Sequence, residues 1–126
     1  MSLGAELEAC LEGAAACRAA ALVDLDAGLI LGMSGETADA SGAGEALAAA
    51  ACELLGRALP PALAGERGGA FDHAVVAGEQ ALHVFQRLAD TPDRALCLTF
   101  DPAVAPDAAL AHARERQQAL AEAGLW

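Results

Sequence analysis

The sequence predicts an α/β protein of the α+β type, in which helices cover a five-stranded, mostly antiparallel sheet. Two short apolar runs within residues 19–32 are separated by an Asp-Ala-Gly turn at Asp26–Gly28, a pattern typical of a β-hairpin. An alanine-rich stretch then ends at Pro60-Pro61, as a long helix would. Three more strand-like runs and a final helical segment complete the order α-β-β-α-β-β-β-α, and the composition shows no domain boundary between residues 1 and 126.

The N-terminal segment has the apolar spacing of an amphipathic helix. Leu3, Leu7 and Cys10 recur at intervals of three or four residues, while glutamates occupy the other face. Ser2 is a suitable N-cap for this helix. The hairpin that follows is expected from Leu22 to Leu31, because its glycine supplies the positive φ that closes a tight turn.

The middle helix is expected from about Gly42 to Leu59, with Ser41 as its N-cap. Alanines extend its apolar surface nearly all the way round, and such a helix is normally buried on more than one side. We therefore expect a stable homodimer in which this helix and the strand Phe71–Val76 form the interface. The interface residues expected on this basis are Leu47, Ala51, Leu54, Leu55, Phe71 and Val75.

Three strands are expected after the middle helix. Phe71–Val76 and Ala81–Arg87 form a hairpin, and Arg94–Phe100 is the fifth strand. Side chains alternate between the two faces of a strand, so the fifth strand is expected to divide into two sets. Leu96, Leu98 and Phe100 form one set, and Ala95, Cys97 and Thr99 form the other.

The final helix is expected to begin near Pro106, because proline is favoured in the first turn. It continues to Ala123 and ends before Gly124. His112 has charged neighbours on this helix and is expected on its solvated face.

The charge of the chain limits its partners. It carries a net charge of −11, and all seven basic residues are arginine. A surface this acidic repels nucleic acid and anionic membranes and favours a basic protein partner. No apolar run reaches the roughly 20 residues that span a bilayer, and no signal-peptide pattern is found, so we expect a cytoplasmic protein.

The four cysteines, Cys10, Cys17, Cys52 and Cys97, are scattered without a metal-binding spacing. A helix would place Cys10 and Cys17 on one face but two turns apart, too far for a disulfide. We expect all four to act as small buried hydrophobes in a reducing compartment.

The sequence contains no set of residues with the spacing of an active site. His73 and His83 lie on strands expected to pair, and the strand register decides whether they share a face, as a shared metal ion would require. The absence of lysine excludes a Walker A lysine and a Schiff base, and Ser34 lacks the spacing of a nucleophile elbow. We therefore expect no catalytic, metal-binding or cofactor-binding residues and no enzymatic activity.

With its elements in this order, the chain resembles the roadblock (dynein light-chain roadblock-type) domain family. Residues Ala20–Leu31 carry the likeness, since Val-Asp-Leu-Asp-Ala-Gly within them is similar to the family's opening Val-Asp-x-Asp-x-Gly hairpin. The small-residue helix Ala46–Leu55 and the strand Arg94–Phe100 fall in the corresponding places. The resemblance implies one roadblock-like, profilin-like domain over residues 1–126 that pairs through an edge strand and the middle helix.

The resemblance also implies a function. Roadblock-like domains are non-enzymatic partners, scaffolds or regulators of small Ras-like GTPases, so we expect such a partner for this chain. The acids Glu36, Asp39 and Glu45 surround the entry to the middle helix, and we expect them to contact it. Any help with GTP hydrolysis is expected to be indirect, by positioning the GTPase's own groups, unless Arg57 or Arg67 reaches the nucleotide as an arginine finger. The alternative is a small-ligand or signal sensor domain of profilin-, PAS- or GAF-like architecture.

Overall fold

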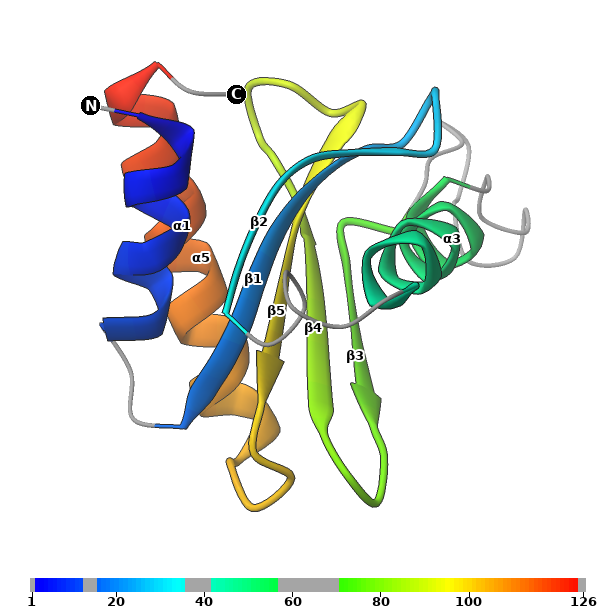
Figure 1. Ribbon diagram of the computed structural model, residues 1–126, viewed down its shortest axis with the longest axis vertical. Helices are drawn as coiled ribbons and strands as arrows, with labels where there is room; N and C mark the ends of the chain where they lie inside the picture. The colour runs from blue at the N-terminus through cyan, green and yellow to red at the C-terminus, as the bar shows by residue number, and fades with distance from the viewer. Residues whose placement is uncertain (1, 13–15, 36–41, 57–70, 125–126) are drawn as a thin grey trace, which may run out of the picture.

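The computed structural model describes residues 2–12, 16–35, 42–56 and 71–124. These residues form three layers, with the sheet lying between α1 and α5 on one face and α3 on the other (Figure 1). The elements are α1 (Leu3–Glu12), β1 (Cys17–Asp24), β2 (Leu29–Gly35), α3 (Ala43–Leu55), β3 (His73–Ala77), β4 (Leu82–Arg87), β5 (Arg94–Phe100) and α5 (Pro106–Ala123). Their type and order confirm the predicted fold class.

The sheet has the strand order β2-β1-β5-β4-β3, and every neighbouring pair is antiparallel. The central pair joins the two hairpins, because β1 of the first lies beside β5, which also pairs with β4 of the second. The strands β2 and β3 are therefore the two edges of the sheet. This order places the start of β1 and the end of β5 close to the start of β4.

The first hairpin is longer than predicted, because β1 begins at Cys17 and β2 continues to Gly35. Its turn has the expected chemistry. The Asp24 carboxylate accepts hydrogen bonds from the backbone N–H groups of Asp26 and Ala27 at 3.0 and 3.1 Å. Gly28 has a φ of 68°, a left-handed conformation that glycine adopts without steric cost.

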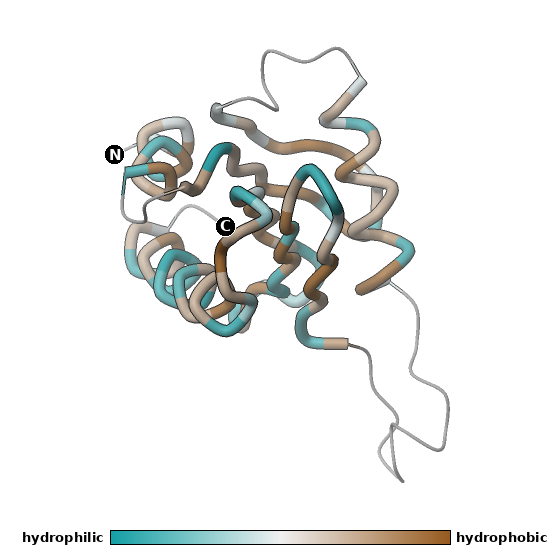
Figure 2. The backbone as a smooth tube through the Cα atoms, turned by 90° about the horizontal axis from the view of Figure 1, so that it is seen from below, coloured by the Kyte–Doolittle hydropathy of each residue, from teal (hydrophilic) through white to brown (hydrophobic). Residues whose placement is uncertain are grey.

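Each face of the sheet has its own core, and hydrophobic residues concentrate along the strands between the helical layers (Figure 2). Leu96, Leu98 and Phe100 of β5 pack beneath α1 and α5, whereas Ala95 and Cys97 lie on the α3 side. The predicted division of β5 into two faces is confirmed. The division follows from the two-residue period of a strand, and both faces of this central strand are buried.

The middle helix α3 crosses the sheet and contacts all five strands. Its buried residues are small or aliphatic, which brings the helix close to the sheet: Gly44, Ala48, Ala51 and Leu55. The helix starts at Ala43 with Gly42 as its N-cap, and no side chain caps it, so a glycine in the left-handed region starts the helix. The predicted cap Ser41 and the predicted last turn up to Leu59 lie outside the described residues.

The final helix has the predicted bounds, and Gly124 is its left-handed C-cap with a φ of 71°. The prediction for His112 was wrong, because this side chain is buried against α1 and not solvated. Helical spacing gives the reason: His112 lies one turn after Ala109 and about two turns before Leu120, and both of these residues are buried. Charged sequence neighbours had suggested exposure, although adjacent residues on a helix point in different directions.

The four cysteines are free. Cys10, Cys17 and Cys97 are buried as predicted, while Cys52 is only half-buried. Cys17 lies on β1 and not on a helix shared with Cys10, although the two belong to the same core. Within the described ranges, no helix combines the length and apolar character needed to cross a membrane.

Candidate functional site

The two edge strands differ in their suitability for extending the sheet. The register between β1 and β2 shifts so that Leu31 has no partner, which makes it the extra residue of a β-bulge. A bulge interrupts the hydrogen-bonding ladder and so protects an edge against further pairing. Strand β3 pairs with β4 from His73 to Ala77 without any shift, and it contains no carboxylate, lysine or proline. The β3 edge is therefore the one suited to pair with another strand.

Exposed apolar side chains lie beside this edge. Val76 on β3 is 40% exposed, and Phe71 just before the strand is 44% exposed. The flank of α3 carries Leu47 and Leu54, which are only partly buried against the α3-side core. Phe71 and Val76 thus leave apolar surface uncovered along the β3 edge, and Leu47 and Leu54 leave further apolar surface exposed along α3.

The six residues predicted for the dimer interface occupy different environments. Ala51 and Leu55 have 0% exposure and are covered by the sheet of their own chain, so they pack α3 against that sheet. Val75 is half-buried on the opposite face, against the core beneath α1 and α5. Leu47, Leu54 and Phe71 retain exposed surface on which a partner could pack.

Among the predicted partner-binding acids, the structure places Glu45, while Glu36 and Asp39 lie outside the described residues. Glu45 is exposed in the first turn of α3. It lines a shallow groove of about 280 Å³ between β2 and α3, which we call the β2–α3 groove. The other lining residues are mainly apolar: Gly28, Leu29, Ile30, Met33, Gly44, Ala48 and Ala49. Arg57 and Arg67 also fall outside the described ranges.

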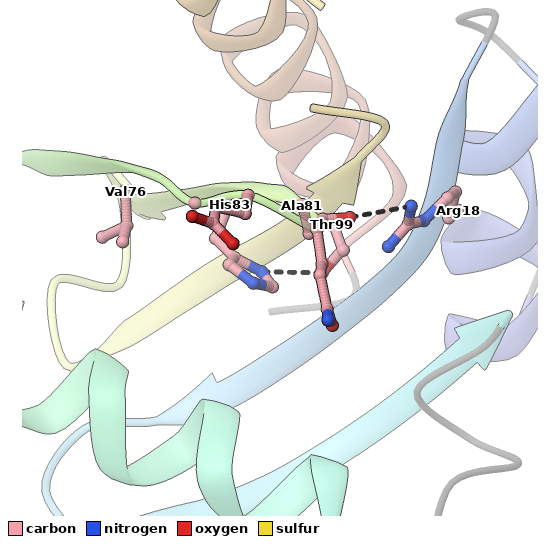
Figure 3. A pocket seen from close by; sticks show the side chains of 8 residues that line it. Arg18, Val76, Ala81, His83 and Thr99 are labelled. Atoms are coloured by element: carbon pink, nitrogen blue, oxygen red, sulfur yellow. Dashed lines mark hydrogen bonds between the residues drawn. The ribbon is translucent and has the colours of Figure 1, made fainter. Parts of the chain in front are cut away.

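A second hollow lies on the α3 side of the sheet, at the end formed by the β3–β4 hairpin. This hairpin hollow has a volume of about 500 Å³ and is lined by Arg18, Val76, Gly78, Glu79, Gln80, Ala81, His83 and Thr99. Figure 3 shows polar side chains from β1, β4 and β5 gathered around it. The strand register explains this arrangement, since Thr99 pairs with His83, which in turn pairs with Val76. The row formed by Thr99, His83 and Val76 lies nearer to the β3–β4 turn than the part of the sheet that α3 covers.

Hydrogen bonds hold the polar groups of the hairpin hollow in place. The His83 Nδ1 and Thr99 Oγ1 atoms are 3.1 Å apart, and Arg18 Nη1 donates to the Gln80 carbonyl at 3.1 Å. Burial lowers the pKa of His83, and the positive charge of Arg18 lowers it further. The ring is therefore held in its neutral form at neutral pH.

Arg18 reaches this hollow from an irregular part of β1. The register between β1 and β5 shifts between Cys17 and Ala19, and such a bulge redirects the side chain of the inserted residue. Gly35 of β2 packs against this bulge with a φ of 83°. A Cβ atom at that position would lie 2.3 Å from the Arg18 carbonyl oxygen, so the close approach requires glycine.

The register also shows whether His73 and His83 share a face of the sheet. His73 is opposite Gln86, and His83 is opposite Val76, three residues along β3 from His73. Positions three apart on a strand face opposite sides, so His73 and His83 do not share a face. Among the described residues, no group of three or more His, Cys, Asp or Glu side chains is placed to hold a metal ion.

The buried cysteines have the electrostatics of structural residues. Burial raises the pKa of Cys10 to about 12 and that of Cys17 to about 11, and it also raises the pKa of Cys97. A thiol with a raised pKa carries almost no thiolate at neutral pH, and the thiolate is the nucleophilic form. These three side chains therefore contribute packing and not nucleophilic chemistry.

The sequence reasoning missed the hairpin hollow, although two signals for it exist. Thr99 interrupts the apolar run Ala95–Phe100, and His83 occupies the matching place in the apolar strand β4. A polar residue within an otherwise buried strand indicates a stretch of sheet that is not fully covered. The register needed to join Thr99, His83 and Val76 in one row was not readable from either strand alone.

Neither a protein-family model nor a curated protein sequence matches the chain. Solved structures do match it over most of its length. The Roadblock/LC7 domain from Streptomyces avermitilis has a TM-score of 0.76 at 15% identity, with 100% of both chains covered. MglB from Myxococcus xanthus has a TM-score of 0.70 at 16% identity, with 94% of this chain and 91% of that chain covered.

Two further MglB structures have the same TM-score of 0.65. The gliding protein MglB from Thermus thermophilus is 22% identical, and an MglB described in a tetrameric arrangement is 23% identical. Both comparisons cover 94% of this chain and 84% of the other. At these identities the likeness concerns the fold, and it shows that this chain has the roadblock fold.

Proposed function

From the roadblock fold of this chain, we propose that it is a non-enzymatic, homodimeric regulatory or scaffold module that binds a small Ras-like GTPase. The observation that carries the proposal is the match of the fold along the whole chain. Fold alone does not determine function, so the surfaces of the molecule must supply the rest. We place the module in the cytoplasm and in bacterial signalling, in line with the bacterial source of the similar structures named above.

The homodimer is supported by the edge strand β3. Its uninterrupted register with β4 leaves a regular outer edge, while Val76 and Phe71 supply exposed apolar area beside it. Antiparallel pairing of two β3 strands would bring these side chains and the Leu54 flank of α3 under cover. Such an interface is self-complementary, as a twofold dimer requires.

The partner-binding surface is proposed at the other end of α3. The β2–α3 groove offers apolar contact through Leu29, which is 59% exposed, and one carboxylate through Glu45. A partner segment with an apolar side chain next to a lysine or arginine fits this combination. The overall charge of −11 would steer such a basic segment towards the chain. This groove lies at the β2 end of α3, so the homodimer would leave it accessible.

The test is capture of a GTPase from the native cell extract, followed by titration of the purified GTPase in its GDP-bound and GTP-bound states. We expect the Glu45→Arg variant to bind more weakly, because it places like charge against a basic partner segment. Glu122→Arg on α5 is the matched control, since it makes the same charge change on the opposite layer. Equal loss of binding in both variants would show that only overall charge matters.

The absence of enzymatic activity is tested with the same reagents. The chain alone should leave GTP unhydrolysed, and any acceleration should require the GTPase. Recovery of a histidine kinase or a defined small molecule, with no GTPase, would contradict the proposed function and favour a sensor.

A further inference from the structure

We propose that Asp72, His73 and Gln86 form a binding site for a divalent transition-metal ion of the zinc class at the start of the β3 edge. The ligand atoms are a carboxylate oxygen of Asp72, Nδ1 of His73 and Oε1 of Gln86. The third ligand is an amide oxygen, so the site is not one made only of His, Cys, Asp and Glu side chains. The proposal does not depend on the binding of a GTPase.

The strand register brings the three residues together. His73 on β3 lies directly opposite Gln86 on β4, so the two side chains share a face of the sheet, with Cβ atoms about 4.5–5.5 Å apart. Gln86 also pairs with Leu96, whose side chain belongs to the core beneath α1 and α5. Asp72 comes directly before β3, and its carbonyl accepts a hydrogen bond from the Arg87 N–H at 2.8 Å. This bond holds Asp72 beside Gln86.

Both neighbouring side chains converge on one carboxylate oxygen. Asp72 Oδ2 is 3.7 Å from His73 Nδ1 and 3.2 Å from Gln86 Nε2. The Gln86 carboxamide also donates to the carbonyls of Asp72 and Arg87, at 3.4 and 3.0 Å. These three contacts fix the carboxamide next to Asp72, so its oxygen is held there as well.

Two of the proposed ligand atoms are buried acceptors. Within the part of the chain that the structure describes, neither His73 Nδ1 nor Gln86 Oε1 has a hydrogen-bond partner. The Gln86 side chain is only 3% exposed, and 3.7 Å is too long for a hydrogen bond between His73 and Asp72. Buried polar groups are nearly always paired, so two unpaired acceptors side by side call for a shared partner. With its proton on Nε2, the ring offers a lone pair at Nδ1, and one cation would meet this lone pair, the amide oxygen and the carboxylate together.

The donor set favours zinc over magnesium or calcium, because an imidazole nitrogen is among the ligands. Two ligand atoms on a tetrahedral zinc ion lie about 3.3 Å apart when each bond is about 2.0 Å long. His73 Nδ1 and Asp72 Oδ2, at 3.7 Å, therefore need to approach by only a few tenths of an ångström. The Asp72 side chain is 68% exposed, which gives the ion a route of entry and leaves room for a water ligand.

The experiment titrates the chain, purified without a histidine tag, with zinc chloride in an isothermal calorimeter. The ¹⁵N spectrum of the histidine rings is recorded with and without zinc, because it distinguishes coordination through Nδ1 from coordination through Nε2. The variants are His73→Gln and Gln86→Leu, and circular dichroism checks that each is folded. His83→Gln is the matched control, since it removes an equally half-buried histidine from the other face of the sheet.

We expect one zinc ion per chain and a shift of the His73 Nδ1 signal. Affinity should fall by about tenfold or more in His73→Gln and in Gln86→Leu, and it should be unchanged in His83→Gln. No binding by the wild type, or binding that survives His73→Gln, would overturn the site. Binding that needs His73 but is as tight in Gln86→Leu would show only a surface histidine that takes up zinc, and would also overturn it.

Discussion

His112 on α5 donates a hydrogen bond from its Nε2 to the carbonyl oxygen of Cys10 on α1, at 2.8 Å. Cys10 is two residues before the end of α1, so its carbonyl is among the four at the helix terminus that lack partners within the helix. The ring also meets Phe100 edge-on, with centroids 6.0 Å apart. One side chain thus joins the two helices that cover one face of the sheet to the strand β5 beneath them.

We expect His112→Ala to destabilise the chain by about 1–3 kcal/mol, because it leaves a buried carbonyl without a donor and removes a packed ring. The measurement is the free energy of unfolding from urea denaturation at a fixed protein concentration. Arg114→Ala, an exposed position on the same helix, should change the free energy by less than about 0.5 kcal/mol. A His112→Ala variant as stable as the wild type would show that the hydrogen bond contributes nothing to holding α1.

Arg87 provides a second prediction, because it joins three separate segments. Its Nε donates to the Phe71 carbonyl at 3.1 Å, and its guanidinium also donates to the carbonyls of Pro92 and Leu55. Lysine has the charge but not the planar array of donors, so Arg87→Lys should lower the free energy of unfolding by about 1–3 kcal/mol. Arg114→Lys, exposed on α5, is the matched control. Equal stability of the two variants would show that charge alone suffices at position 87.

The pH dependence of stability follows from the lowered pKa of His83. The ring has an ordinary pKa of 6.5 when unfolded and a lower one in the hollow, so the unfolded chain binds more protons between these values. Stability contributed by this group is therefore present above pH 6.5 and is lost as the pH falls below it. The free energy of unfolding of the wild type should decline faster from about pH 7 to about pH 5 than that of His83→Gln. Parallel curves would contradict the prediction.

The sequence was sufficient to predict the type and order of the elements, because the patterns that identify each element are local. The turn residues Asp24 and Gly28 and the alternation within β5 identified elements whose structure depends on nearby residues. The sequence did not show which elements contact one another. The sequence showed that Ala51 lies on an apolar face, but only the packed structure shows that its own sheet covers it. The hairpin hollow likewise depends on register across three strands, which no single segment contains.

The choice between the two edges of the sheet leads to the last prediction. Val76 on β3 and Leu31 on β2 have nearly equal exposure, 40% and 39%, but only β3 has an uninterrupted register. A lysine on an edge strand opposes pairing, because burying its charge without a partner is costly. Val76→Lys should therefore convert dimers to monomers at micromolar concentration, while Leu31→Lys, which removes a leucine of similar exposure, should remain dimeric. Light scattering after gel filtration measures both masses against the 12.6 kDa chain. Monomers from Leu31→Lys and dimers from Val76→Lys would move the interface to the β2 edge, where a bulge would have to be accommodated.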